Sequence, residues 1–319
     1  MHKKISLIVS ATLLSLVLVG CGKASLTVAH KTYSPSGMTA IVKGHSNQKK
    51  VTYQVNGAKA KTQTVNGGGY AITLPAKPYQ QRVKISAGSQ HVTTVVKKSP
   101  AIKSYTDFKT AYNQVLMVTA LSKKNQTAVT QLQAQAAKLK QQQAQITTAM
   151  KSAEAKLKAG DTSATATITA ETQKATQLKA SAAKLQQAQA KLAPALKKAK
   201  AQVADQTITA TGKTGIYNLK KTSTATVRGN IDHGNVIGLT LMVPTSALKS
   251  TKAAKSFMTE LAVLTNSVGA NTKTVLNGFK NKANKKNSNQ TTTSTIRSNH
   301  IDFDLGYSTS TLYIYITHH

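Results

Sequence analysis

Two stretches of this sequence decide its fold: VTQLQAQAAKLKQQQAQITTAMKSAEAKL, residues 129–157, and ITAETQKATQLKASAAKLQQAQAKLAPALKKAKAQV, residues 168–203. Both consist mainly of Ala, Gln, Lys, Leu and Thr, and residues 105–205 contain a single glycine and a single proline. This composition is typical of long α-helices, because the residues that interrupt a helix are almost absent.

Apolar or small residues recur in these stretches at alternating spacings of three and four, which is typical of a coiled-coil seam. The first seam comprises Phe108, Ala111, Val115, Val118, Val129, Leu132, Ala136, Leu139, Gln143, Ile146, Met150, Ala153 and Leu157. The second comprises Ile168, Glu171, Ala175, Leu178, Ala182, Leu185, Gln189, Leu192, Leu196, Ala199 and Val203. The alanines among them should permit a close approach of the two helices.

Between the seams, Gly160 can end one helix and Asp161 to Ser163 can cap the next. We therefore expect an antiparallel coiled-coil hairpin over residues 101–206. Its first arm, from Phe108 to Leu157, should be about 75 Å long at ~1.5 Å per residue. Gln143 and Gln189 either mark the register or are tolerated flaws, and Pro194 should bend the second arm without breaking the seam.

The segment before the hairpin, residues 21–100, has the pattern of a small β-sandwich. Seven short strands are expected, near residues 25–29, 38–44, 51–55, 58–65, 70–74, 82–87 and 91–97. Asn56-Gly57 is a strong signal for a two-residue hairpin turn. The strand pattern, and Val83-Lys84-Ile85-Ser86-Ala87 after Tyr79, resemble bacterial Ig-like surface modules, and this resemblance implies an Ig-like sandwich.

The segment after the hairpin, residues 207–319, predicts an α+β domain of the ββαββ type. Strands at 224–229 and 236–243 flank the turn at His233-Gly234, and the second strand should place Ile237, Leu239, Leu241 and Val243 on one face. A helix is expected from residue 249 to 268, then a shorter helix carrying Val275, Leu276 and Phe279, a loop at 280–295, and strands at 301–305 and 311–317. The chain as a whole is predicted to be a multidomain α+β protein.

The first twenty residues have the build of a secretory signal peptide. Lys3 and Lys4 precede an apolar run of 15 residues, which is short for a helix that crosses a bilayer. The run ends in Leu18-Val19-Gly20-Cys21, which resembles the bacterial lipobox. The resemblance implies that Leu18, Val19 and Gly20 are the recognition residues and that Cys21 receives a diacylglyceryl group, with palmitate-type acyl chains.

The protein is then expected on the extracytoplasmic face of a cell membrane, held by membrane lipid. An ordinary signal peptide with a chance cysteine, or a short membrane anchor, are the alternatives. Cys21 is the only cysteine of the chain, so neither an intrachain disulfide nor a cysteine-based metal site can form.

The charge of the chain points to anionic partners. It has 43 Lys+Arg against 9 Asp+Glu, a net charge of +34. Nearly all the cations are lysines, which favours diffuse attraction over bidentate phosphate recognition. Anionic lipid headgroups or anionic cell-wall polymers are therefore the expected partners. Nucleic acid is not expected, because there is an export signal and no tryptophan for stacking. The alternative is that the charge serves only solubility.

Residues for catalysis are sparse. Asp302 and Asp304 alternate with apolar residues and should lie on a solvated strand face, and a calcium loop starting there would have Tyr313 where a carboxylate is required. His318-His319 is at most a weak metal ligand, and no GxSxG elbow is present. We expect no enzyme activity, no catalytic residue, no cofactor and no metal site.

These patterns together predict a cell-envelope lipoprotein that binds or scaffolds at the surface, with a protein partner able to reach the helical hairpin. One alternative is an accessory subunit of an export or efflux assembly, since the β–hairpin–β layout loosely resembles membrane-fusion adaptors. Another is a small-ligand receptor formed by the C-terminal domain.

Overall fold

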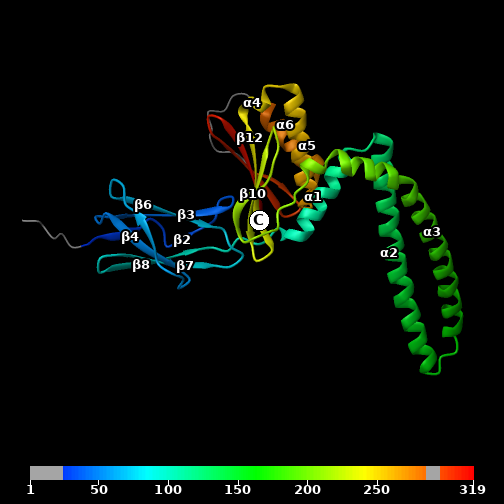
Figure 1. The fold of residues 1–319 in the computed structure, drawn as a ribbon. Helices are drawn as coiled ribbons and strands as arrows, with labels where there is room; N and C mark the ends of the chain where they lie inside the picture. The colour runs from blue at the N-terminus through cyan, green and yellow to red at the C-terminus, as the bar shows by residue number, and fades with distance from the viewer. Residues whose placement is uncertain (1–23, 285–294) are drawn as a thin grey trace, which may run out of the picture. The chain divides into compact units, whose positions relative to one another are not determined.

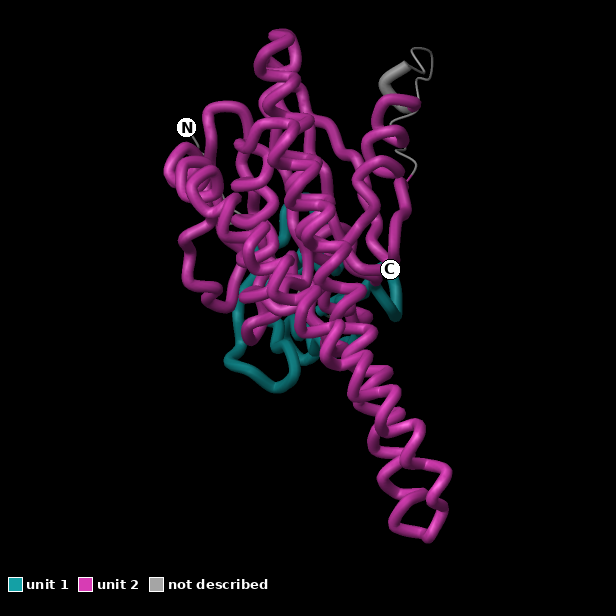
Figure 2. Tube along the Cα trace, turned by 90° about the vertical axis from the view of Figure 1, so that its right-hand side faces the viewer, with its two compact units in different colours: residues 1–33, 41–72, 82–95 teal, residues 34–40, 73–81, 96–319 magenta. Residues whose placement is uncertain are grey.

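The computed structural model describes residues 24–284 and 295–319. The chain is a multidomain α+β protein with N-terminal β-sheets, a long helical hairpin and a C-terminal antiparallel sheet with helices, as the sequence predicted (Figure 1). It divides into two compact units (Figure 2). Unit 1 takes the described residues up to Tyr33 with Ile41–Ile72 and Arg82–Val95, and unit 2 takes Ser34–Ala40, Thr73–Gln81 and Val96–His319.

Eight strands form two N-terminal sheets, ordered β1-β3-β6 and β2-β8-β7-β4-β5. They are β1 Leu26–Val28, β2 Thr32–Tyr33, β3 Thr39–Ser46, β4 Lys50–Val55, β5 Lys61–Thr64, β6 Gly69–Pro75, β7 Gln81–Ala87 and β8 Gln90–Val96. Strand β3 alternates buried and exposed residues, as expected for a strand with one face in a core. Asn56 and Gly57 have φ of 51° and 75°, and the Ala58 amide donates to the Val55 carbonyl at 3.0 Å, so the predicted tight turn forms. The two-residue hairpin loop does not, because β5 begins only at Lys61, which pairs with Tyr53 of β4. The two-residue strand β2 was not predicted because it is too short to show alternation.

The hairpin consists of α2, Lys123–Lys158, and α3, Ala164–Gln202, which lie side by side in opposite directions (Figure 1). Gly160 has φ of 92° in the turn between them, which a residue with a side chain rarely adopts. Pro194 lies inside α3 without ending it. The 36 residues of α2 correspond to about 54 Å of helix.

The prediction of one continuous first arm from Phe108 to Leu157 is wrong. Residues 105–119 form a separate helix, α1 (Tyr105–Thr119), and α2 begins only after Ser122, whose side chain accepts a hydrogen bond from the Asn125 amide. A serine that caps a new helix in this way competes with continuation of the old one. The buried residues of α1 are Tyr105, Phe108, Tyr112 and Leu116, which lie in the core of the C-terminal sheet, so Phe108 is the one predicted seam residue of α1 that is fully buried.

The C-terminal sheet has seven antiparallel strands in the order β10-β11-β12-β15-β14-β13, with β9 also pairing with β12. The strands are β9 Lys103–Ser104, β10 Gly215–Lys221, β11 Thr226–Asp232, β12 Asn235–Pro244, β13 Ile296–Ser298, β14 Ile301–Tyr307 and β15 Thr311–His318. The helices are α4 Thr245–Leu248, α5 Thr251–Ser267 and α6 Thr272–Asn284, and a 3-10 turn, η1 Ala204–Gln206, follows α3. The predicted ββαββ order is therefore extended by β10 and β13 at the two edges of the sheet.

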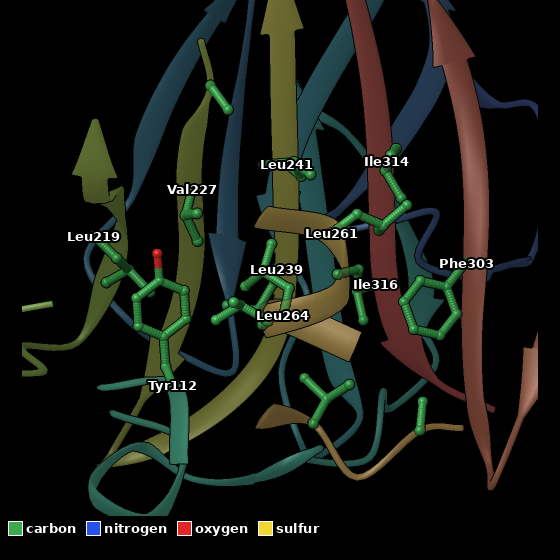
Figure 3. Packing of buried hydrophobic residues seen from close by; sticks show 14 of the residues in the cluster. Tyr112, Leu219, Val227, Leu239, Leu241, Leu261, Leu264, Phe303, Ile314 and Ile316 are labelled. Atoms are coloured by element: carbon green, nitrogen blue, oxygen red, sulfur yellow. The ribbon is translucent and has the colours of Figure 1, made fainter. Parts of the chain in front are cut away.

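Helices α1, α5 and α6 contribute to a single hydrophobic core with the sheet. Figure 3 shows part of this packing, in which Leu261 and Leu264 of α5 lie over Leu239 and Ile316 of the sheet. The predicted face of β12 needs one correction. The β11–β12 register shifts between Asn230 and Ile231, so Val236 joins this core and Ile237, although buried, does not.

The opposite face of the sheet contacts two other segments of unit 2, Ser34–Ala40 and Thr73–Gln81. The buried Asn230 side chain donates to the Met38 carbonyl at 3.3 Å and to the Ala76 carbonyl at 2.8 Å. A Cβ at Gly238 would lie 3.3 Å from the Met38 side chain, so the absence of a side chain there allows this approach.

Candidate functional site

Cys21, predicted to carry the lipid, and Leu18, Val19 and Gly20, predicted as its recognition residues, lie outside the described residues. Within residues 24–284 and 295–319, no helix is both long enough and apolar enough to cross a bilayer. In the same part of the chain, no three His, Cys, Asp or Glu side chains gather where they could hold a metal ion. The remaining polar features are buried pairs in the C-terminal core and the surfaces of the sheet and hairpin.

A buried tyrosine–glutamate pair connects α1 to α5. The Tyr112 hydroxyl donates to Glu260 Oε1 at 2.7 Å, and Tyr112 is fully buried. Burial raises the pKa of Glu260, while the Tyr112 hydrogen bond and the charge of Lys220 oppose that rise. Burial, reinforced by Glu260, raises the pKa of Tyr112 so that it remains a donor. The pair satisfies two polar groups inside an apolar core.

A buried ion pair lies on the other face of the sheet. Asp232, at the end of β11, is fully buried, and its Oδ1 pairs with the ammonium group of Lys77. The Nδ1 atom of His233 lies 3.3 Å from Asp232 Oδ2. Lys77 belongs to the segment that covers this face, so the pair fastens that segment to the turn between β11 and β12.

The two aspartates lie on the face of β14 opposite to the buried apolar residues, as the alternation predicted, and both have partners there. Asp302 Oδ1 lies 3.2 Å from Arg297 Nε and 3.1 Å from His319 Nδ1, and the Asp302 side chain is 15% exposed. Asp304 Oδ1 accepts from the Thr295 hydroxyl at 2.5 Å. Pairing of β14 with β13 and β15 brings these partners together, and the sequence could not show that pairing.

Three histidine rings lie near one another, and one of them, His319, pairs with Asp302. The rings of His300 and His318 are stacked with centroids 6.1 Å apart, and the His319 ring lies 5.7 Å from His300. A depression of about 350 Å³ adjoins them. It is lined by Ser34, Pro35, Ser36, Gly37, Lys97, Lys98, Ser99, Pro100, Asp302, Asp304, Thr317, His318 and His319. It mixes both charge signs, and both aspartates in it already have partners, so it offers little that would select one ligand.

The seam of the hairpin is less buried than a coiled-coil core. Leu139, Ile146, Leu178 and Leu185 are only half-buried, although they occupy the predicted packing positions. Two alanines at predicted packing positions, Ala175 and Ala182, are exposed. Aliphatic surface is therefore left open to solvent in the middle of the hairpin.

That surface lines a groove of about 540 Å³ between α2 and α3, open to solvent rather than enclosed. The residues that line it are Ala136, Leu139, Lys140, Gln143, Ile146, Thr147, Ala175, Leu178, Lys179, Ala182 and Leu185. A second groove, of about 440 Å³, shares Ile146 and Leu178 with the first but is otherwise mainly polar. Its remaining lining is Gln142, Gln145, Ala149, Glu171, Lys174, Gln177 and Ser181, with Glu171 paired to Lys174 at 2.7 Å. The hairpin thus has one apolar groove and one polar groove.

The hairpin is strongly basic. Residues 123–202 contain fourteen lysines, no arginine and three carboxylates, which gives a net charge of +11. Of the carboxylates, Glu171 is paired with Lys174, and Asp161 accepts hydrogen bonds from the Ser163 hydroxyl at 2.5 Å and the Ser163 amide at 3.0 Å. The Ser163 hydroxyl and amide hold the pKa of Asp161 below its ordinary value. This arrangement can attract anions, and it brings together no groups for bond-making chemistry.

Comparison with known proteins adds little. No family model and no curated protein matches the chain. One solved structure that matches is an FMN-binding β-glucuronidase from Facaelibacterium prausnitzii L2-6, with 21% identity over 24% of this chain, 12% of the glucuronidase chain and a TM-score of 0.22. A similarity of this extent supports no conclusion about fold or activity.

Sequence reasoning missed the apolar groove, although its signal was present. The packing positions between the large residues of each arm are Ala136 and Gln143 on α2, and Ala175 and Ala182 on α3. A seam with about one large apolar residue per seven leaves fewer side chains to cover each large residue of the opposite helix.

Proposed function

We propose that this chain is a non-enzymatic, lipid-anchored protein of the bacterial cell envelope that holds anionic surface polymers or lipid headgroups through its basic helical hairpin. A diacylglyceryl group on Cys21 would keep it on the extracytoplasmic face of the membrane. The proposal rests above all on the hairpin, whose fourteen lysines are opposed by three carboxylates over residues 123–202.

The type of cation supports a polymer or headgroup partner. A lysine ammonium group acts as a hydrated point charge, whereas an arginine guanidinium makes bidentate contacts with one phosphate. An array of lysines on a long helix pair therefore suits a repeating anion better than a single phosphorylated ligand. Each contact with such a polymer is weak, and many act together.

The architecture proposed for this role has three parts. The two N-terminal sheets, with three and five strands, support an Ig-like sandwich, and the heptad spacing of α2 and α3 supports an antiparallel coiled-coil spacer. The C-terminal α+β domain would be a ββαββ core with an added strand at each edge. Two acyl chains on Cys21 would anchor the protein firmly, because one chain alone binds a membrane only marginally.

Two measurements test the proposal. Mass spectrometry of the N-terminal peptide from the native membrane-extracted protein should find a diacylated peptide that begins at Cys21; an uncleaved or unmodified N-terminus would remove the anchor. The full chain should also bind teichoic-acid-type polymer or anionic vesicles with an affinity that falls steeply as salt is raised. Binding that ignores salt would refute the role given to the lysines.

A further inference from the structure

The apolar groove of the hairpin is an aliphatic surface that no described residue covers. Leu139 and Ile146 contribute from α2, and Leu178 and Leu185 contribute from α3, each half-buried. The second groove shares Ile146 and Leu178 with the first but is otherwise lined mainly by polar residues, among them glutamines, Ser181 and the Glu171–Lys174 pair, so more aliphatic surface lies in the first. The same two helices therefore present one face suited to water and one suited to an apolar partner.

The charge around the groove narrows the choice of partner. Lys140 on α2 and Lys179 on α3 line it, and no carboxylate does. A second copy of this hairpin would place a net charge of +11 against another of +11, with lysines facing lysines. An occupant with an apolar stripe and carboxylates along its flanks complements both features of the groove.

The shape of the groove further limits which kind of partner can bind there. Its lining runs from Ala136 to Thr147 on α2, which is about 16 Å, or three helical turns. Because the groove is open, an extended acyl chain lying in it would keep one side in water. A helix, about 10 Å across, can rest on both α2 and α3 and cover the half-buried leucines with its own apolar residues.

We propose that the apolar groove binds an acidic amphipathic helix of a partner protein, so that the α2–α3 hairpin becomes a three-helix bundle. The helix would place apolar residues at i, i+3 or i+4, and i+7 against the leucine row, and its glutamates or aspartates would meet Lys140 and Lys179. This interaction goes beyond the proposed function, because it needs neither the lipid anchor nor an anionic polymer and can hold if both are absent.

The first experiment measures binding of a fluorescent synthetic helix to the full chain by anisotropy. The probe is a peptide of about 14 residues with leucines along one helical face and glutamates elsewhere. Two control peptides have the same leucines with lysine in place of glutamate, and the same composition in scrambled order. The acidic amphipathic peptide should bind and gain helical circular dichroism, while both controls bind at least about tenfold more weakly.

The second experiment locates the binding with matched charge reversals. The double variant Lys140→Glu/Lys179→Glu should weaken the peptide by at least about tenfold. The control Lys138→Glu/Lys184→Glu makes the same change of net charge on the same two helices, at exposed residues that line neither groove, and should change affinity less than about threefold. Ala182→Phe should weaken binding by filling the groove, and far-UV circular dichroism checks that each variant keeps its helices.

Three results would overturn the inference. One is failure of the acidic peptide to bind at millimolar concentration. Another is equal loss in the two double variants, which would mean that the peptide senses only the overall charge. The third is that phosphatidylglycerol vesicles, and not the peptide, depend on Lys140 and Lys179, which would assign the groove to a lipid surface.

Discussion

Removal of the Tyr112 hydroxyl is the sharpest test of how the C-terminal core handles a buried carboxyl group. In Tyr112→Phe the ring still fills its place, but Glu260 Oε1 loses the donor that lies 2.7 Å from it. A hydrogen bond to a charged group contributes about 1.5–3 kcal/mol, and an abandoned buried acceptor costs a similar amount. We therefore expect the free energy of unfolding to fall by about 2–3 kcal/mol near neutral pH.

The pH dependence of this variant has a definite sign. The pKa of Glu260 is raised in the folded protein, mainly by burial, so the folded state holds its proton at pH values where the unfolded chain has lost it. The stabilising contribution is complete below the unfolded pKa of a glutamic acid and is lost as pH rises toward the folded pKa. Because the Tyr112 hydrogen bond lowers the pKa of Glu260, Tyr112→Phe should raise that pKa further and extend the loss to higher pH.

Native-state hydrogen exchange of α1 and α5 amides, measured between pH 5 and 8, would follow this local stability. Tyr105→Phe is the matched control, because the Tyr105 hydroxyl in the same helix donates to the neutral Ala210 carbonyl at 2.9 Å. It should cost about 1 kcal/mol with no added pH dependence. Glu260→Gln should flatten the pH profile of the parent protein. The reasoning is refuted if Tyr112→Phe and Tyr105→Phe lose equal stability with equal slopes against pH.

Two further substitutions test local features of the fold. Ser122→Ala should remove the side chain that caps the start of α2 and cost about 1 kcal/mol of local stability. Hydrogen exchange should then be faster for amides in the first turns of α2. Unchanged exchange there would mean that Ser122 does not set the boundary between α1 and α2. Lys77→Met should leave the fully buried Asp232 without its cation and lower the free energy of unfolding by about 3–5 kcal/mol in urea denaturation, whereas the exposed Lys84→Met should change it by less than about 0.5 kcal/mol. A loss below about 1 kcal/mol for Lys77→Met would contradict the role given to the pair.

The sequence was most informative where local chemistry decides the structure. The turn at Asn56-Gly57, the turn at His233-Gly234 and the long helices of the hairpin follow from φ preferences and from composition, which act over a few residues. The local spacing of Phe257, Leu261 and Leu264 also predicted the buried stripe of α5, and all three side chains lie in the core.

The sequence was less informative where contacts with residues far along the chain determine the local structure. The predicted seam ran through Phe108, Ala111 and Val115, whereas the buried stripe of α1 continues from Phe108 through Tyr112 and Leu116. Packing against α5 favours the second face of the helix, and the local spacing does not show that packing. The bulge that places Val236, and not Ile237, in the core depends on the register of β12 with β11. Glu260 carries no sign in the sequence that a tyrosine about 150 positions earlier will bury it and donate to it.

The open groove also bears on how the hairpin is stabilised. A helix pair normally gains most of its stability from buried packing positions, but in the middle of this hairpin the leucines and the isoleucine at those positions are only half-buried. Alanine, glutamine, lysine and leucine, which make up most of α2 and α3, have high intrinsic helix propensity, so the helices depend less on that packing. Near the end of α3, Ala199 and Val203 are buried, and Val203 joins the C-terminal core, which fixes that end of the rod. A hairpin supported in this way can leave one groove empty, and an added helix would complete its packing without being required for its folding.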